Sequence, residues 1–399
     1  MLNEIMSRIH TLDKSSPKDF LGIQIELRTL IIECERKIVQ NRNKVKGLKW
    51  SKRNYAKSVD KSILKINKYE RIIDRFNRRQ DAIQYERMKL KFLGDCIAYK
   101  VYEEFDIRQL SKNNDPGFIF DKEGSEFEVE VALEHAKDGY YVLLHDITNC
   151  LRVGDLSIVS NEGKPVMIEC KETRTGELKI NDRLIRQVER MMSIDSIMKS
   201  EVNTEVKSVN TEMLYKYNLP TEIIEIKAEV IYHYSVLEKL CQTENNFEVI
   251  EVEPGLTYAV VKDGYEEDLY RELEVRFENC SILSSNLLRR IEGEFENIPP
   301  FGIGIKSSKV LIEIFDVDII AFIFIDMNIV QELFKNLGCE DGVELVGNDE
   351  NIEYVRVIGR NSQIGPRIFN RVRYGLLSLE TAVLQIVELI NYQSSTKPN

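Results

Sequence analysis

The stretch GDLSIVSNEGKPVMIECKE, residues 154–172, decides how the central part of this chain folds. It contains two runs of alternating apolar residues, separated by the turn-forming triplet Asn161-Glu162-Gly163. Such a pattern is typical of a β-hairpin. If the triplet is the loop and its glycine is left-handed, Ser160 pairs with Lys164, and the register of the two strands is fixed.

The predicted register gives the hairpin one apolar side. Leu156 faces Ile168 across the two strands. Ile158 faces Val166 in the same way. We expect this side to be buried, because aliphatic side chains are stabilised when they are removed from water.

The opposite side of the hairpin gathers charged residues. Asp155 lies directly across from Glu169, and Lys171 lies two residues further along the same face. A two-residue loop would instead place Asp155 opposite Cys170 and spoil the apolar pairing. The side-chain pattern therefore selects the register that brings two carboxylates and a lysine together.

The paired carboxylates of Asp155 and Glu169 predict a metal site. Like charges on neighbouring strands repel each other unless a cation or a proton relieves them. Mg²⁺ or Mn²⁺ prefers such oxygen ligands, and the backbone carbonyl of Cys170 is well placed to supplement them. A metal there activates water and neutralises charge on a phosphate, and Lys171 would stabilise the same charge. The chemistry predicted is phosphodiester hydrolysis.

This arrangement resembles the core motif of the PD-(D/E)XK nuclease superfamily. Asp155 is followed, after the hairpin, by Glu169-Cys170-Lys171, and Gly154 stands where the name-giving proline would be. The resemblance covers residues 118–200 or thereabouts. It implies a restriction-endonuclease-like αβββα core with Asp155, Glu169 and Lys171 as catalytic residues. The alternative is an exposed hairpin face whose charges carry no function, and His145 and Asp146 are interpreted as loop residues rather than ligands.

A glutamate on the helix before the hairpin would complete the metal site. Gly124-Ser-Glu-Phe-Glu128 resembles the Gly-x-x-Phe-Glu pattern of the Mrr-like restriction branch, and this nominates Glu128 as a further catalytic residue and metal ligand. Glu126, Glu130 and Glu134 stay open as alternatives, because the outer face of the helix is acidic. Gln187, on the helix predicted after the hairpin, is nominated to position the nucleophile or a phosphate, and a solvated helix face is the competing interpretation.

The segment before the hairpin predicts a basic helical arm. Residues 36–91 hold 19 Lys or Arg against 5 Asp or Glu, an excess of 14 positive charges, although the whole chain has a net charge of −11. Helical spacing of apolar residues predicts one helix that ends before Gly47 and a second from Val59, which together form a helical hairpin or coiled coil. Two interpretations stay open: a face for homo-oligomerisation, or a surface whose Lys, Arg, Trp50 and Tyr55 contact phosphates.

The fold class predicted for the whole chain is α+β, with three domains. Residues 1–93 form the basic arm or coiled coil, residues 94–200 the nuclease domain, and residues 221–399 a C-terminal α/β domain of unknown role. In the last of these, strands are predicted at 228–234, 247–252, 258–261, 310–315 and 319–325.

Composition narrows the classes of protein that fit. The seven cysteines are scattered without a Cys-x-x-Cys pair, which argues against a disulfide framework and a structural zinc site. The longest apolar run, residues 319–325, is too short to cross a bilayer and is interpreted as a buried strand. The N-terminus lacks the features of a secretory signal, so a cytoplasmic protein is expected.

The sequence thus predicts a Mg²⁺- or Mn²⁺-dependent endonuclease that acts on DNA. Restriction or antiviral defence is the setting that the resemblance implies, with a defence-system partner protein as a further expectation. Two alternatives stay open. One is an RNA-directed nuclease, and the other is a nucleic-acid-binding or assembly protein with an inactive nuclease-like core.

Overall fold

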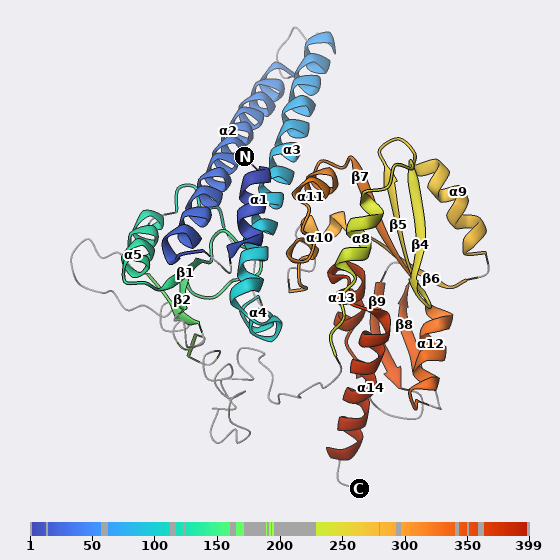
Figure 1. Ribbon diagram of the computed structural model, residues 1–399. Coiled ribbons are helices and arrows are strands. Elements are labelled where there is room, and N and C mark those ends of the chain that lie inside the picture. Colours follow the sequence, from blue (N-terminus) through green and yellow to red (C-terminus); the bar gives the residue numbers. More distant parts are fainter. Residues whose placement is uncertain are drawn as a thin grey trace. The chain divides into compact units, whose positions relative to one another are not determined.

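The chain is a mixed α+β protein with a long helical arm in its N-terminal part (Figure 1), as the sequence predicts at this coarse level. Its contacts divide it into two units, one within residues 11–102 and 109–199, the other within 1–10, 103–108 and 200–399. The first unit therefore combines most of the predicted arm with the predicted nuclease segment. The computed structural model describes residues 2–12, 15–56, 63–111, 117–122, 124–159, 165–170, 189, 191–192, 194, 229–278, 280–292, 297–339, 343–348, 351–357 and 363–396.

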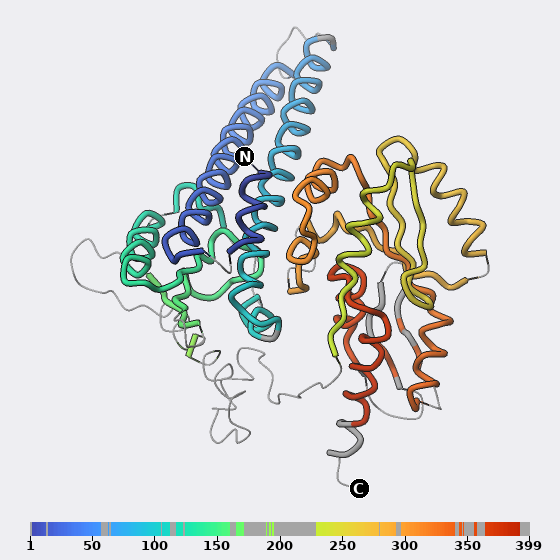
Figure 2. Tube along the Cα trace, in the orientation of Figure 1, coloured from blue at the N-terminus to red at the C-terminus, as the bar shows by residue number. Residues whose placement is uncertain are grey.

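The arm consists of two long antiparallel helices, α2 (Pro17–Ala56) and α3 (Ile63–Val101), which lie side by side (Figures 1 and 2). Ser16 caps α2, since its hydroxyl accepts the N–H of Asp19 at 3.1 Å. The prediction that the first helix ends before Gly47 is wrong, because α2 continues through it. A glycine inside a helix costs only about 1 kcal/mol, and the burial of flanking residues such as Val45 outweighs that cost.

A three-stranded antiparallel sheet lies in the same unit. Its strands β1 (Tyr141–Leu144), β2 (Leu156–Val159) and β3 (Val166–Ile168) are arranged in the order β1-β2-β3. Leu156 is the partner of Ile168, and Ile158 is the partner of Val166, so the predicted register is confirmed. The predicted loop, residues 161–163, lies outside the described residues.

Burial on the apolar side of the hairpin is uneven. Leu156 is fully buried, as predicted, but Val166 at the other end of the pairing is 55% exposed. The helix that precedes the sheet, α5 (Ser125–Lys137), buries Ala132 and Ala136, which are one turn apart. Leu133 is 40% exposed, because a helical residue next to the buried Ala132 points about 100° away from it.

The arm helix α2 is hydrogen-bonded to the edge strand β1 of this sheet. The side-chain amide of Gln24 donates to the carbonyl of Val142 at 2.8 Å, and its oxygen accepts the N–H of Leu144 at 2.9 Å. β1 is an edge strand, whose outward backbone groups would otherwise lack partners in the sheet. One buried glutamine therefore satisfies both groups and fixes α2 against β1.

A second buried side chain of α2 joins both arm helices to the loop before α5. The carboxylate of Glu35 is fully buried and accepts a hydrogen bond from the Nε of Arg87 on α3 at 2.7 Å. It also accepts the N–H groups of Ile119 at 2.6 Å and Phe120 at 2.9 Å. The base of the arm is thus part of the core of this unit.

The second unit contains a four-stranded antiparallel sheet in the order β4-β5-β7-β6 and a smaller sheet in the order β10-β9-β8. The strands predicted at 247–252, 258–261 and 319–325 are confirmed. β7 pairs with strands on both sides, and its apolar run is a strand as predicted. None of the helices in the described part of the chain is long and apolar enough to span a membrane.

The bounds of the strands of this unit are β4 (Phe247–Glu253), β5 (Leu256–Lys262), β6 (Ile282–Asn286), β7 (Ile319–Asp326), β8 (Val343–Asn348), β9 (Asn351–Val357) and β10 (Gln363–Ile364). Its helices are α1 (Leu2–His10), α8 (Tyr234–Cys241), α9 (Glu266–Arg276), α10 (Leu288–Ile291), the 3₁₀ turn Phe301–Ile303, α11 (Ser308–Phe315), α12 (Met327–Asn336), α13 (Arg367–Gly375) and α14 (Leu379–Thr396). The short helix α4 (Glu104–Leu110) begins in this unit and ends in the other.

Two strand predictions in this unit are wrong. Residues 310–315 form the helix α11, because Ser307 caps its first turn and the buried residues recur at helical spacing. Of the run 228–234, the described residues contribute only an isolated bridge from Tyr232 to Leu377, and α8 begins at Tyr234. Short apolar runs have no period of their own, so helix and strand are not distinguished by composition alone.

Glu35 offers a test of how the base of the arm is held. Glu35→Ala leaves the buried guanidinium of Arg87 without its carboxylate and removes the acceptor of two backbone N–H groups. We expect the free energy of unfolding to fall by roughly 3–5 kcal/mol, measured by urea denaturation followed by circular dichroism. Glu33→Ala, two residues away in an exposed pair with Lys37, is the control and should leave the urea midpoint almost unchanged. Equal midpoints for the two variants would contradict this assignment.

Candidate active site

One lysine bridges two of the carboxylates that the sequence nominates. The ammonium of Lys122 lies 2.6 Å from Oε1 of Glu128 and 3.3 Å from Oδ1 of Asp155. Glu128 comes from α5 and Asp155 from the residue before β2, so two separate elements converge on one cation. The Asp155 side chain is 12% exposed and that of Lys122 is 39% exposed. The site is therefore reached from solvent on the lysine side.

Glu128 is distinguished from its three alternatives by burial. It lies on the inward face of α5, one turn before Ala132, and is only 4% exposed. Glu126, Glu130 and Glu134 are all exposed. Burial therefore separates Glu128, which the Gly-x-x-Phe-Glu pattern nominates, from the other three glutamates.

Asp155 is held by backbone groups of both neighbouring strands. Its N–H donates to the carbonyl of Ile168 at 2.9 Å, and its carbonyl accepts the N–H of His145 at 3.0 Å. Its side chain accepts the N–H of Cys170 at 2.8 Å. At Cys170, the group that reaches the carboxylate is the N–H, a hydrogen-bond donor, whereas the sequence predicts the carbonyl of this residue as a ligand.

Gly154 explains a departure from the superfamily motif. Its φ of 74° lies in the left-handed region. Proline, which has φ fixed near −65°, cannot adopt that conformation, and a Cβ at this position would lie 3.2 Å from the carbonyl oxygen of Ile168. The backbone of this chain therefore requires glycine immediately before Asp155.

The structure describes only some of the remaining nominated residues. Glu169 directly follows β3, and its Oε2 is shielded from solvent. The pairing of β2 with β3 ends at Leu156 and Ile168, so the placement of Asp155 directly across from Glu169 stays a prediction. Lys171 and Gln187 lie outside the described residues. Within the described part of the chain, no three Asp, Glu, His or Cys side chains lie close enough together to hold a metal ion. The structure thus brings together Glu128, Asp155 and the backbone of Cys170 around an ammonium group.

Burial and charge make Glu128 an unusual acid. Burial raises the pKa of Glu128 to about 7, the hydrogen bond from Lys122 opposes that rise, and the negative charges of Asp155 and Asp146 add to it. For Lys122, burial alone would lower the pKa, but the charges of Asp155 and Glu128 raise it overall. Burial raises the pKa of the Cys170 thiol to about 12, and the charges of Asp155, Glu128 and Glu169 add to that rise.

Two residues that directly follow β1, His145 and Asp146, make contacts beside the candidate site. His145 is fully enclosed, with Nδ1 2.7 Å from the carbonyl of Val153 and Nε2 2.6 Å from the hydroxyl of Ser157. Burial lowers the pKa of His145 to about 4, so it is neutral. Asp146 pairs with Arg28 of α2 at 2.9 Å. Both residues lie in a loop, as predicted, and the hydrogen bonds of His145 hold the segment around Asp155.

Sequence reasoning missed Lys122 and Arg28. Neither has a periodic or motif signal, because each meets its partner across the tertiary structure. Lys122 lies two residues before the glycine of the Gly-x-x-Phe-Glu pattern. That closeness is the one signal that could have nominated it.

No protein family, no curated protein and no solved structure matches this chain in comparisons of its sequence and fold. The resemblance to the PD-(D/E)XK superfamily therefore rests on the residues quoted for it.

The raised pKa of Glu128 predicts a pH dependence of stability. The folded protein holds a proton up to about pH 7 that the unfolded chain releases near 4.5, so this group lowers the free energy of unfolding as pH rises between these values. Glu128→Gln removes that loss. The free energy of unfolding of Glu128→Gln, minus that of wild type, should therefore increase by roughly 1–3 kcal/mol as the pH rises from about 5 to about 8, measured by urea denaturation. Glu130→Gln, on the exposed face, is the matched control, and identical pH profiles for both variants would exclude the assignment.

Proposed function

We propose that this chain is a metal-dependent endonuclease that hydrolyses phosphodiester bonds of DNA. Asp155, Glu169 and Lys171 on the hairpin are the catalytic residues, together with Glu128 on α5. The observation that carries the proposal is the single ammonium of Lys122, which bonds both Glu128 and Asp155. At this position, the largely buried carboxylates of Glu128 and Asp155 already bind a positively charged group.

The residues around this position fit a hard divalent cation. Carboxylate and carbonyl oxygens are the ligands that Mg²⁺ and Mn²⁺ prefer over a thiol. Asp155, Glu128, Glu169 and the carbonyl of Cys170 would hold the ion. When bound, Mg²⁺ would supply a Lewis acid that stabilises charge on a phosphate. Lys122 would leave the carboxylates as the metal enters, since its side chain reaches solvent.

The chain's own residues have separate roles in this proposal. Lys171 stabilises the negative charge that develops during attack on phosphorus, and Gln187 positions the nucleophile or a phosphate oxygen. Asp155 is oriented by the N–H of Cys170, and it therefore needs no further rearrangement to act as a ligand.

The order of elements supports a restriction-endonuclease-like αβββα core. The helix α5 precedes β1, β2 and β3, and the described residues at 189, 191, 192 and 194 are again helical. The methyl carbon of Met191 would lie 3.6 Å from a Cβ at position 154, so this helical segment packs beside the start of β2. Restriction or antiviral defence is the setting proposed, on the strength of the Mrr-like pattern at residues 124–128.

Cleavage tests the proposal directly. Purified protein with Mg²⁺ or Mn²⁺ should cut duplex or single-stranded DNA and stop when chelator is added, with RNA assayed in parallel to define the substrate. Asp155→Ala and Lys171→Ala should each lower the rate by a factor of roughly 100 or more, because each removes charge stabilisation in the transition state. Glu130→Gln should cut at the wild-type rate. Undiminished cleavage by folded Asp155→Ala and Lys171→Ala, with folding checked by circular dichroism, would refute the site.

Lys122 provides a test that does not depend on cleavage. If a divalent ion takes the position of this ammonium, Lys122→Met should bind Mn²⁺ roughly tenfold more tightly than wild type, because a competing positive charge is gone. Isothermal titration calorimetry measures the affinity. Lys137→Met removes an exposed positive charge from the end of α5, the helix that carries Glu128, and is the control. Unchanged or weaker binding by Lys122→Met would show that the metal does not occupy this position.

A further inference from the structure

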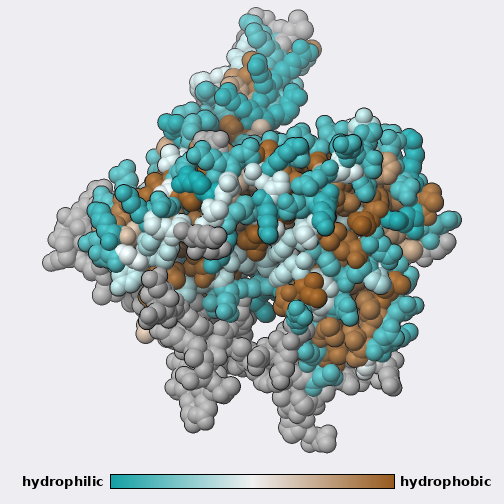
Figure 3. Space-filling model, viewed as in Figure 1, coloured by the Kyte–Doolittle hydropathy of each residue, from teal (hydrophilic) through white to brown (hydrophobic). Residues whose placement is uncertain are grey.

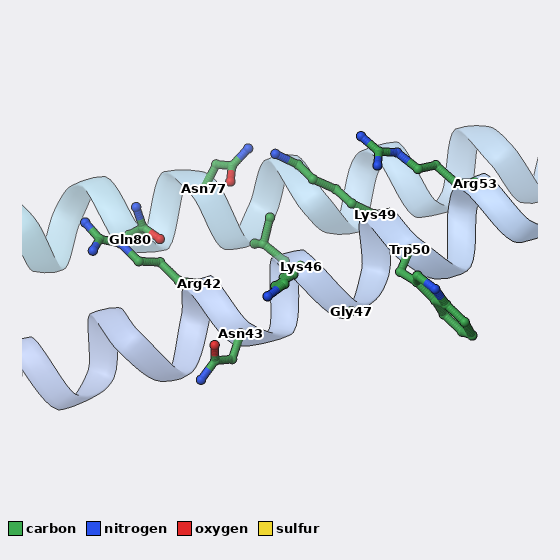
Figure 4. Close-up of a pocket in the computed structure, with 10 residues that line it drawn as sticks. Arg42, Asn43, Lys46, Gly47, Lys49, Trp50, Arg53, Asn77 and Gln80 are labelled. Carbon is green, nitrogen blue, oxygen red and sulfur yellow. The ribbon is translucent and has the colours of Figure 1, made fainter.

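A hollow of about 780 Å³ lies along the arm, away from the candidate active site (Figure 4). Four cations of α2 line it, at positions 42, 46, 49 and 53, together with Trp50. We propose that this hollow, here called the arm groove, binds single-stranded nucleic acid. Its cations hold successive phosphates, and an unpaired base stacks on the indole of Trp50.

The charge of the arm groove favours a polyanion. Arg42, Lys46, Lys49 and Arg53 recur at intervals of three or four residues, so they form one stripe along α2. All four are exposed, and the lining contains no acidic residue. Among the described residues, no acidic side chain forms an ion pair with any of them. Figure 3 shows that the projecting arm is mostly hydrophilic on the face in view.

Trp50 is the feature that points to bases rather than to phosphate alone. It is the chain's single tryptophan and is 68% exposed, although an indole is strongly stabilised by burial. Figure 4 shows its ring projecting outward from α2, while Lys49 and Arg53 extend across α3. Aromatic rings beside a cationic groove are how proteins hold unpaired strands, since every base has a face that can stack. The bases of a duplex have those faces covered by their neighbours.

Gly47 leaves room for such a ligand. It lies one turn before Trp50 in the middle of α2, where glycine costs about 1 kcal/mol relative to alanine. Packing does not require glycine there, because a Cβ would meet no atom within 4 Å. The bare backbone beside the indole instead permits close approach of a base or sugar. Asn77 and Gln80 of α3 complete the lining with neutral donors and acceptors.

A second copy of the chain fits this surface less well. A two-fold dimer places the same patch of both subunits together, so four cations would face four cations. The apolar seam that would drive helix association is already filled within the arm, where Ile38, Val45 and Ile73 are buried. The arm groove therefore favours a nucleic acid over self-association.

The fluorescence of Trp50 reports on the arm groove alone, because the chain has no other tryptophan. Binding is measured with an oligothymidylate of about 20 nucleotides, long enough to exceed a typical single-strand site, and with a duplex of equal length. Chelator is present throughout, so the outcome is independent of the proposed cleavage. We expect saturable quenching by the single strand, tighter binding of it than of the duplex, and a slope of log K against log salt of about −3 for four phosphates.

Variants separate stacking from charge. Trp50→Ala should weaken single-strand binding roughly 5- to 150-fold, measured by anisotropy of a labelled oligothymidylate, and Trp50→Phe should retain part of the affinity. The double variant Lys46→Glu, Lys49→Glu should weaken binding further and reduce the salt slope by about half. The matched control, Lys18→Glu, Lys37→Glu, makes the same charge change on α2 outside the arm groove and should have the smaller effect.

Three results would overturn the proposal. The first is equal affinity for duplex and single strand without a change in tryptophan fluorescence. The second is wild-type binding by Trp50→Ala. The third is a concentration-dependent shift of Trp50 emission in protein alone, which would assign the surface to self-association. Loss of cleavage with intact binding would count against the nuclease proposal and leave the arm groove standing.

Discussion

The antiparallel pairing of β2 with β3 is the constraint on which the candidate site depends. A strand has a side-chain period of two, so a shift by one residue would move Asp155 to the opposite face. The observed pairing of Leu156 with Ile168 prevents that shift, because Leu156 is fully enclosed. The left-handed Gly154 then turns the chain out of the loop after β1 and into β2. Asp155 is thereby fixed by packing on one face of the strand and by backbone hydrogen bonds at its own position.

The carboxylate of Asp155, held in this way, repels the neighbouring carboxylate of Glu128 when both are ionised. The two acids come from different elements, since Glu128 lies on α5 and Asp155 directly before β2. Burial already favours the protonated form of Glu128, and the charge of Asp155 strengthens that preference. Lys122 relieves the repulsion from the solvent side. The side chain that supplies this positive charge is 39% exposed, and the proposed exchange of the ammonium for a metal ion rests on that exposure.

Local patterns in the sequence predict much of this, and tertiary contacts explain what they miss. The hairpin register follows from the turn triplet and the alternation of apolar residues, and Glu128, which a five-residue pattern nominates, lies on the buried face of α5. The helix through Gly47 is missed because packing against α3 outweighs the propensity of one residue. Lys122 and Arg28 are missed because their partners are distant in sequence. Residues 310–315 look like a strand until the cap at Ser307 is taken into account.

The helix α2 connects the two features for which functions are proposed. Near its start, Arg28 bonds Asp146 and the carbonyl of Ser125, the first residue of α5. Further along, the same helix carries Trp50. At a rise of 1.5 Å per residue, these points lie about 33 Å apart along one rigid element. A short oligonucleotide bound in the arm groove would not reach the carboxylates, whereas a longer strand following α2 would. Under the two proposals, the basic arm would concentrate a polyanion in a chain whose remaining residues are acidic, and the candidate site would accept phosphate only when a cation offsets Glu128 and Asp155.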